Sequence, residues 1–209
     1  HSFPTRRSSD LLGAKVMQSN SVQQGMMNDV EIHVRSTFTN NEGTSITGDD
    51  KISYDKVITG VAYSKDDAKI TLIGVEDRPG IAASIFKPLY ENNISVDMIV
   101  QNVSADNKKT DVTFTIKRED LDKSVNFIKK NSNLKFEKIT FDDKVAKVSI
   151  VGAGMITHPG VAFKMFKALS DQNINILVIS TSEIKISVLI DENQTQKAVV
   201  AIHTAFDLD

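Results

Sequence analysis

The chain has 209 residues, with 25 Lys and Arg against 27 Asp and Glu and no cysteine. Because it has no basic excess and no clustered basic face, we expect no nucleic-acid partner, and the missing cysteines exclude disulfides, thiolate nucleophiles and Cys-ligated zinc. No apolar stretch approaches the roughly 18 residues that cross a membrane, so we expect a cytoplasmic protein of one or two domains with no membrane partner.

Residues 1–10, HSFPTRRSSD, have neither apolar periodicity nor a helix cap, and they resemble a translated sequencing adapter. We therefore expect this segment to be non-native, with true sequence from Leu11 and further sequence missing upstream. The alternative is a native tail, because chain termini are often poorly ordered.

Residues 11–47 predict a short helix ending near Gly25 and then an alternating strand over 30–34. Alternation of apolar and polar residues is typical of a half-buried strand. Residues 40–55 are polar and contain Gly and Asp, which favours a linker or surface loop. We therefore place a domain boundary near Asp49.

The next segment predicts, in chain order, strands over 57–63 and 68–74, a helix from Pro79, strands over 94–103 and 110–116, a helix over 119–130 and a strand over 134–141. Pro79-Gly80 fits a helix start, because proline is tolerated where helical N–H groups have no partner. Ile81, Ile85 and Leu89 share one helical face. From residue 64 the order is β-α-β-β-α-β.

Residues 148–182 repeat the plan of residues 70–102: an apolar strand, a Pro-Gly turn, a helix and another strand. Identical residues lie at a constant offset of 80, namely Pro79 and Pro159, Gly80 and Gly160, Phe86 and Phe166, Leu89 and Leu169, Asn93 and Asn173, and Ile94 and Ile174. This spacing exceeds the roughly 20–50 residues of a solenoid repeat. We therefore predict two small α+β domains.

The second copy predicts a strand over 145–152, a helix over 160–172, strands over 174–181 and 184–190, and a helix over 195–206. It has no closing strand, whereas the strand over 57–63 is left over before the first copy. We predict that this strand completes the second sheet. The first domain, 64–143, would then be inserted in a second domain made of 57–63 and 144–209.

Four segments carry a family resemblance: LGAKVMQSNSVQ with EIHVRSTF, ITGVAYSKDDAKITLIGVEDRPG, VDMIVQNVS with TDVTFT, and VSIVGAGMITHPGVAFKMFKAL with ISTSEIKISVLI. From Leu11 onward the chain resembles the C-terminal part of aspartate kinase, which phosphorylates aspartate at the head of lysine, threonine and methionine biosynthesis. It is most similar to the lysine- and threonine-responsive bacterial enzymes, whose regulatory half is also made separately as a β subunit.

The resemblance implies two ferredoxin-like ACT domains in tandem, preceded by the tail of an amino-acid kinase domain over 11–48 and a linker over 49–56. Nothing matches the family's Lys-Phe-Gly-Gly phosphate motif, and Gly152, Ala153 and Gly154 lack the spacing and following Lys of a nucleotide loop. We therefore expect no catalytic residue, metal or cofactor in this chain, which would be inactive alone. The full enzyme would use ATP and Mg.

Asp77 lies just before the Pro79-Gly80 turn, beside the first N–H groups of the predicted helix. A zwitterionic amino acid could place its carboxylate at the helix N-terminus and its ammonium group at Asp77. The alternative is that Asp77 is only a capping or turn residue. In the second copy Thr157 and His158 stand in its place, which puts a second site of this kind in doubt.

The resemblance implies that lysine, threonine or both bind between ACT domains of two subunits. The matching positions on one domain are Asp77, Gly80, Ile81, Ala82, Gln101 and Thr113. Asn175 and Ile176 match positions contributed by the partner subunit, and Ser104 lies beside the site, where side-chain size governs the feedback response.

Association is expected to be homodimeric through the ACT domains, because open sheet edges invite pairing, and a catalytic subunit is a further possible partner. The histidines His33, His158 and His203 lack metal-ligand spacing. Two alternatives to a kinase fragment stay open. One is a complete regulatory subunit without chemistry, and the other is an active kinase, which the absent nucleotide site argues against.

Overall fold

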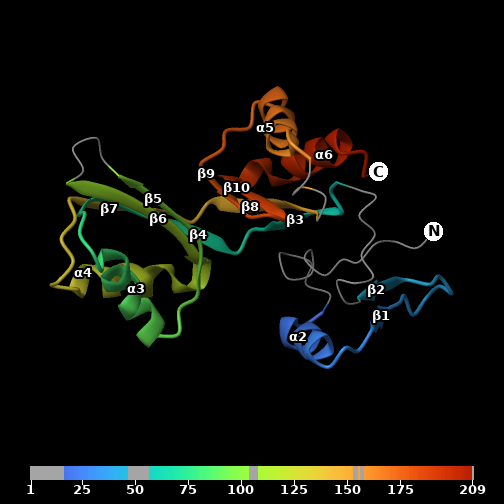
Figure 1. Ribbon diagram of the computed structural model, residues 1–209, viewed down its shortest axis with the longest axis horizontal. Helices are drawn as coiled ribbons and strands as arrows, with labels where there is room; N and C mark the ends of the chain where they lie inside the picture. Colours follow the sequence, from blue (N-terminus) through green and yellow to red (C-terminus); the bar gives the residue numbers. More distant parts are fainter. Residues whose placement is uncertain (1–16, 47–56, 104–107, 153–154, 156–157, 209) are drawn as a thin grey trace.

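The computed structural model describes residues 17–46, 57–103, 108–152, 155 and 158–208. Two four-stranded sheets dominate it, each covered by two helices, and a separate two-stranded ribbon precedes them (Figure 1). Among the described residues, none of the helices is long and apolar enough to span a membrane.

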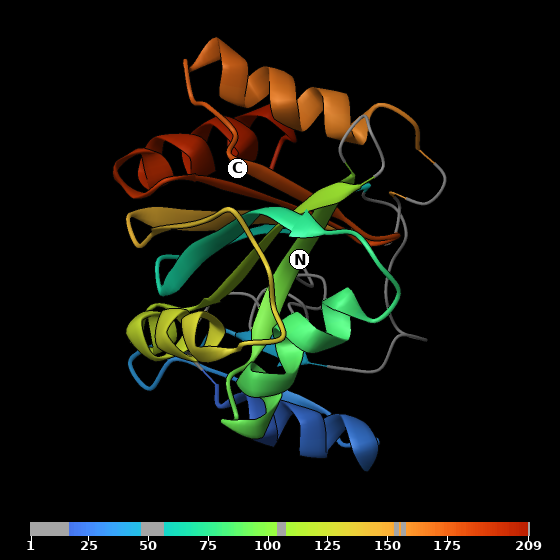
Figure 2. The same ribbon diagram turned by 90° about the vertical axis from the view of Figure 1, so that its left-hand side faces the viewer.

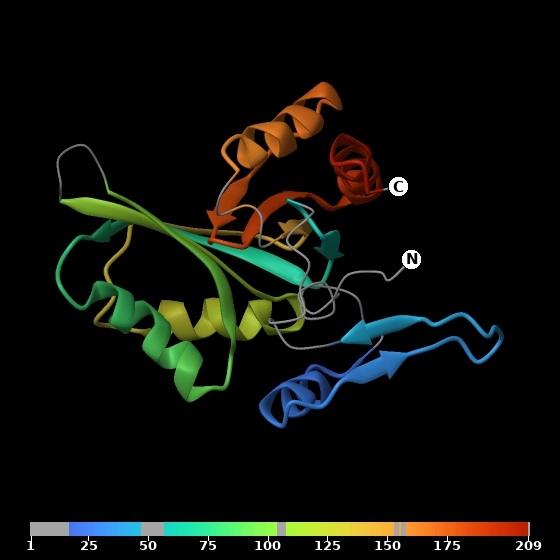
Figure 3. The same ribbon diagram turned by 45° about the vertical axis from the view of Figure 1, so that its right-hand side comes forward.

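The segment before the sheets consists of α2 (Ser19–Met27), β1 (Ile32–Val34) and β2 (Thr44–Ile46). Figure 3 shows the β1–β2 ribbon and α2 outside both four-stranded sheets. The helix ends at Met27, close to the expected end near Gly25, and a Cβ on Gly25 would lie 2.7 Å from the Ile32 side chain, so this glycine allows close packing. One expectation is wrong here. Part of the expected loop over 40–55 forms β2.

The first unit contains β4 (Asp67–Glu76), α3 (Ile81–Glu91), β5 (Val96–Val103), β6 (Lys109–Lys117), the 3-10 turn η2 (Arg118–Asp120), α4 (Leu121–Lys130) and β7 (Lys138–Asp142). Its strands are all antiparallel, in the order β5-β6-β4-β7. The predicted helix face is confirmed, because Ile81, Ile85 and Leu89 are buried against the sheet residues Ile70 and Phe114.

The second unit contains β3 (Gly60–Ser64), β8 (Val145–Val151), α5 (Val161–Asp171), β9 (Val178–Thr181), β10 (Lys185–Asp191), the 3-10 turn η4 (Glu192–Gln194) and α6 (Thr195–Ala205). Its sheet has the order β3-β8-β10-β9. The leftover strand pairs with β8, from Gly60 opposite Val151 to Ser64 opposite Lys147. This pairing confirms that the first unit is inserted in the second.

The repeated Leu, Asn and Ile residues end the first helix of each unit in the same way. Asn93 and Asn173 both have φ of 55°, the left-handed conformation that follows many helices. The Ile94 amide donates to the Leu89 carbonyl at 2.9 Å, and the Ile174 amide donates to the Leu169 carbonyl at 3.0 Å. The same isoleucine and leucine side chains are buried in the core of their unit, so the motif closes the helix and fills the core together.

The sheets lie between the two helix pairs. In Figure 2, α5 and α6 lie on one side of the sheets and α3 and α4 on the other. The helix-free faces meet at a third apolar cluster made of Met98, Val100, Val145, Val178 and Leu189. Helix packing therefore stabilises each unit separately, while this cluster joins them.

Two predicted strands are longer than the observed ones. The strand expected over 134–141 begins only at Lys138, and the strand expected over 174–181 begins only at Val178. Leu134 and Ile174 are nevertheless buried, at 6% and 5% exposure. Their apolar character reflects burial of the connecting segments and not pairing in a sheet. The helix expected from residue 119 likewise begins as the 3-10 turn η2.

Candidate functional site

The segment between β4 and α3 is a tight turn held by backbone hydrogen bonds. The Asp77 amide donates to the Lys108 carbonyl at 3.0 Å, and the Ile81 amide donates to the Arg78 carbonyl at 3.1 Å. Gly80 precedes the helix with φ of 85°, a left-handed conformation that favours glycine. The turn therefore fixes Asp77 and the first helical amides next to one another at the end of β4.

Three hydrogen-bonding groups of this segment have no partner among the described residues. Within the described part of the chain, the amides of Ala82 and Ala83 have no acceptor, and the half-buried Asp77 carboxylate has no hydrogen-bond or ion-pair partner. The capping alternative for Asp77 would require its carboxylate to accept from these amides. The helix instead begins after Gly80 without a side-chain cap.

The other predicted residues of the first unit divide between the two faces of its sheet. Ile81 is 4% exposed and belongs to the core, so only its backbone faces the turn. Gln101 is exposed on the edge strand β5, opposite Val112 and therefore on the helix-covered face. Thr113 points to the helix-free face, where its hydroxyl lies 2.9 Å from that of Thr71. The structure therefore brings Asp77, Gly80 and Ala82 together at the helix start and separates Thr113 from them.

The residues predicted to come from a partner subunit lie between α5 and β9 of the second unit. Asn175 is exposed, whereas Ile176 is half-buried and packs against the second core. Ser104 and Thr157 lie outside the described residues. Of Asn175 and Ile176, only Asn175 therefore has a side chain that is exposed for contact with a ligand.

The second unit repeats the helix start but packs the end of its first strand differently. Gly160 precedes α5 with φ of 94°, like Gly80 in the first unit. A Cβ on Gly152 would lie only 2.2 Å from the Val57 carbonyl, because residues 57–58 cross the end of β8. Thr59 then bonds the Val151 carbonyl through both its amide, at 2.7 Å, and its hydroxyl, at 3.1 Å. The entering chain thus packs on Gly152, which corresponds to Gly74 of β4 in the first unit.

Sequence reasoning missed a charged cluster between the units. Lys147 of β8 has a side chain only 9% exposed, and its ammonium group lies 2.5 Å from Asp97 and 3.5 Å from Asp67. Burial alone would raise the pKa of Asp97, but the hydrogen bond and charge of Lys147, the charge of Lys185 and the Met98 amide lower it overall. A lysine inside the mostly apolar, fully buried strand Val145–Val151 is the signal that could have revealed this cluster.

Known proteins share this sequence and this architecture. The ACT domain family matches residues 70–131 and 148–206. The chain is 46% identical to an aspartate kinase of Pseudomonas putida over 200 residues, which are 95% of this chain and 48% of that protein. It also covers 99% of the ligand-free regulatory subunit of aspartate kinase from Thermus thermophilus, with 39% identity, a TM-score of 0.68 and 72% of this chain matched.

The chain belongs to the aspartate kinase family, in its regulatory ACT-domain part. The aspartate kinase of Clostridium acetobutylicum has the same fold over more of the chain, with a TM-score of 0.81, 27% identity and coverage of 96% of this chain and 46% of that protein. The chain spans about half the length of the curated aspartate kinases that it matches. The two sheets are thus its two ACT units, and the segment before them has a counterpart in complete aspartate kinases.

Proposed function

We propose that this chain is the regulatory part of an aspartate kinase and that lysine, threonine or both bind at the start of α3 as feedback effectors. The observation that carries the proposal is that the Asp77 carboxylate and the amides of Ala82 and Ala83, all in the segment that leads from β4 into α3, have no partner among the described residues. An α-amino acid offers the complementary pair of charges, with its carboxylate on the amides and its ammonium group on Asp77.

The site would be completed across an interface. Gln101 would contact the effector from the edge strand β5, and Asn175 with the backbone at Ile176 would approach from a partner subunit. Open edges at β5 and β9 support association through the ACT units into a homodimer. Ser104 and Thr113 would then influence the site from its border, and the second unit, which has Thr157 and His158 where the first has Asp77, would act mainly as a docking partner.

The domain assignment follows the same comparison. The match to the separate regulatory subunit leaves more than a quarter of this chain uncovered, whereas the match to the C. acetobutylicum kinase covers 96%. This difference favours a kinase tail over 11–48 and a linker over 49–56, and it disfavours a complete regulatory subunit. In a complete, cytoplasmic enzyme the upstream kinase domain would use ATP and Mg to phosphorylate aspartate.

Isothermal titration calorimetry of this chain with lysine and with threonine, each alone and then together, tests the proposal. We expect Asp77→Asn to weaken binding about 10- to 100-fold, because a hydrogen bond to a charged group is worth about 1.5–3 kcal/mol. Asp122→Asn on the exposed surface of α4 is the matched control and should bind as the unaltered chain does. If Asp77→Asn and Asp122→Asn bind the effector with equal affinity, Asp77 does not contribute to the site.

A kinase assay tests the remaining alternative, that this chain is an active kinase. We expect no transfer of phosphate from ATP to aspartate by this chain alone. Turnover that persists after gel filtration would identify the chain as an enzyme in its own right and would overturn the regulatory assignment.

A further inference from the structure

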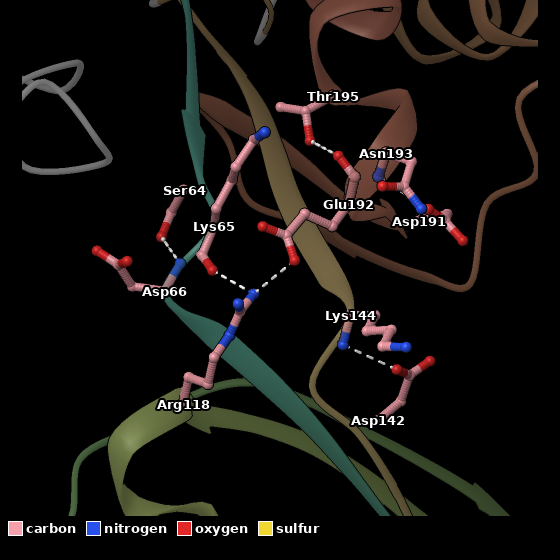
Figure 4. A network of polar contacts seen from close by, with 10 residues as sticks. All are labelled: Ser64, Lys65, Asp66, Arg118, Asp142, Lys144, Asp191, Glu192, Asn193 and Thr195. Atoms are coloured by element: carbon pink, nitrogen blue, oxygen red, sulfur yellow. Dashed lines mark hydrogen bonds and ion pairs between the residues drawn. The ribbon is translucent and has the colours of Figure 1, made fainter.

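The chain passes between the two ACT units at only two places among the described residues. It enters the first unit at Lys65–Asp66, between β3 and β4, and leaves it at Asp143–Lys144, between β7 and β8. Because β3 pairs with β8 and β4 pairs with β7, the two connections lie side by side (Figure 4). Any change in the angle between the units must bend both of them.

Arg118 and Glu192 occupy equivalent positions beside these connections. Each is the first residue of the 3-10 turn between the second inner strand of its unit and the last helix. The Arg118 amide donates to the Asp66 carbonyl at 2.8 Å, and the Glu192 amide donates to the Lys144 carbonyl at 3.0 Å. Each residue therefore fastens its own unit to one connection through the backbone.

The side chains of these two residues join the fastened connections to each other. One guanidinium nitrogen of Arg118 donates to the Glu192 carboxylate at 3.0 Å and to the Lys65 carbonyl at 2.5 Å. Figure 4 shows Arg118 reaching from the first unit between Lys65 and Glu192. The side chains are 37% and 27% exposed, so water screens their attraction only in part.

We propose that the Arg118–Glu192 pair is a clamp that sets the angle between the two ACT units. A continuous path of hydrogen bonds runs from Lys65 through Arg118 and Glu192 to Lys144, and residues at the ends of elements are where hinge motion is absorbed. Charge-assisted bonds are the strong members of such a path. The proposal concerns the geometry between units and does not depend on which effector binds.

A competing arrangement is that the apolar cluster around Met98 and the buried Lys147 fix the angle alone. The Arg118–Glu192 pair would then be an ordinary surface ion pair, with little effect on the angle between the units. The two arrangements differ in what removal of Arg118 does to the distance between units. That distance is therefore the quantity to measure.

The chain contains no cysteine, so spin labels can be attached at two introduced ones, Lys129→Cys on α4 and Gln196→Cys on α6, both exposed. Electron–electron double resonance on labelled chain diluted with unlabelled chain reports the distance within one molecule. We expect Arg118→Ala to broaden the distance distribution about twofold or add a second maximum, since a hinge freed of its contact samples more angles.

Three further variants complete the test. Glu192→Gln preserves shape and should broaden the distribution in the same direction, and Arg118→Ala combined with Glu192→Gln should broaden it no further, because both remove one contact. Lys167→Ala, which breaks the 2.7 Å Lys167–Asp171 pair within α5, is the control and should change nothing. An unaltered distribution in Arg118→Ala, with circular dichroism showing a folded chain, would overturn the clamp.

Discussion

The two ACT units share the backbone conformation at both ends of their first helix, and they differ in the side chains and packing near that helix. Gly80 and Gly160 precede α3 and α5 with φ of 85° and 94°, and Asn93 and Asn173 follow these helices with the same φ of 55°. Among the described residues Asp77 of the first unit has no partner, whereas in the second unit the entering chain packs on Gly152. The repeated residues thus serve the backbone turns and the cores, and the units differ at the positions between them.

The equivalent glycines Gly74 and Gly152 meet two different structural requirements, a left-handed φ and a close backbone approach. Gly74 has φ of 65° at a break in the register of β4 and donates its amide to the Asp111 carboxylate at 2.8 Å. Gly152 instead leaves space for the backbone of Val57. Gly74 and Gly152 therefore match in residue type, but a different physical requirement favours glycine at each position.

The largest expected effect tests whether the two cores are independent. Phe114 is fully buried in the first unit, with its ring edge-on to Phe86 at 5.2 Å, and Val188 is the fully buried counterpart in β10. We expect Phe114→Ala to destabilise the first unit by about 3–5 kcal/mol and Val188→Ala the second by about 1.5–3 kcal/mol. Hydrogen exchange at each unit's amides would measure both losses. Equal loss of protection in both units after either substitution would show that they unfold together.

The second prediction separates the two glycines. We expect Gly152→Ala to cost about 2–3 kcal/mol, because the new Cβ meets backbone that cannot move aside. Gly74→Ala should cost about 1–2 kcal/mol, since its left-handed φ is strained but the nearby Glu137 side chain can rotate away. Gly60→Ala, with open space around its Cβ, is the control. Urea unfolding curves measure the order, and a larger loss at position 74 would contradict this explanation.

Much of this comparison could be predicted from the sequence, because it depends on local pattern. The repeat and the apolar faces of α3 and α4 gave the order of elements, and the missing closing strand indicated the insertion that the β3–β8 pairing confirms. The extents of β7 and β9 were wrong, because Leu134 and Ile174 are apolar for burial alone. Periodicity reports which residues are buried but not whether their backbone has a neighbouring strand.

The contacts between the units could not be predicted in this way. Arg118 and Glu192 lie 74 positions apart, and each is an ordinary charged residue after a strand. The same holds for Lys147 and Asp97, which meet only after the insertion brings β5 next to the second sheet. For the candidate site, the turn around Asp77 could be located from residue types, whereas the opposite orientations of Gln101 and Thr113 follow from sheet register.

A smaller effect should appear equally in both units. Replacing Asn93 or Asn173 by alanine keeps a Cβ in the left-handed region but removes the short polar side chain that lets Asn tolerate this conformation. We expect a loss of about 1 kcal/mol for either alanine variant, whereas glycine at the same position should be close to neutral. Thermal unfolding of the four variants measures this. A loss confined to one unit would mean that the two turns are not equivalent.

The smallest expected effect depends on pH and on a position where the units differ. Asp97 of the first unit corresponds to Leu177 of the second at the offset of 80, so only the first unit places a carboxylate against Lys147. The lowered pKa of Asp97 means that the folded chain holds this proton less tightly than the unfolded chain does. The contribution of the Asp97 carboxylate to the free energy of unfolding is therefore fully present above the pKa of the unfolded chain, near 4. It is lost as pH falls through the lower pKa of the folded chain.

Asp97→Asn should accordingly lower stability at pH 7 by about 0.5 kcal/mol and weaken the loss of stability between about pH 5 and pH 3. The effect is small because the Asp97 side chain is 47% exposed and Lys147 keeps Asp67 as a partner at 3.5 Å. Urea unfolding at several pH values measures the difference, with Asp122→Asn as the exposed control. Parallel curves for the Asp97 variant and the unaltered chain would show that the carboxylate contributes no pH-dependent stability, and that Lys147 joins the units through Asp67 alone.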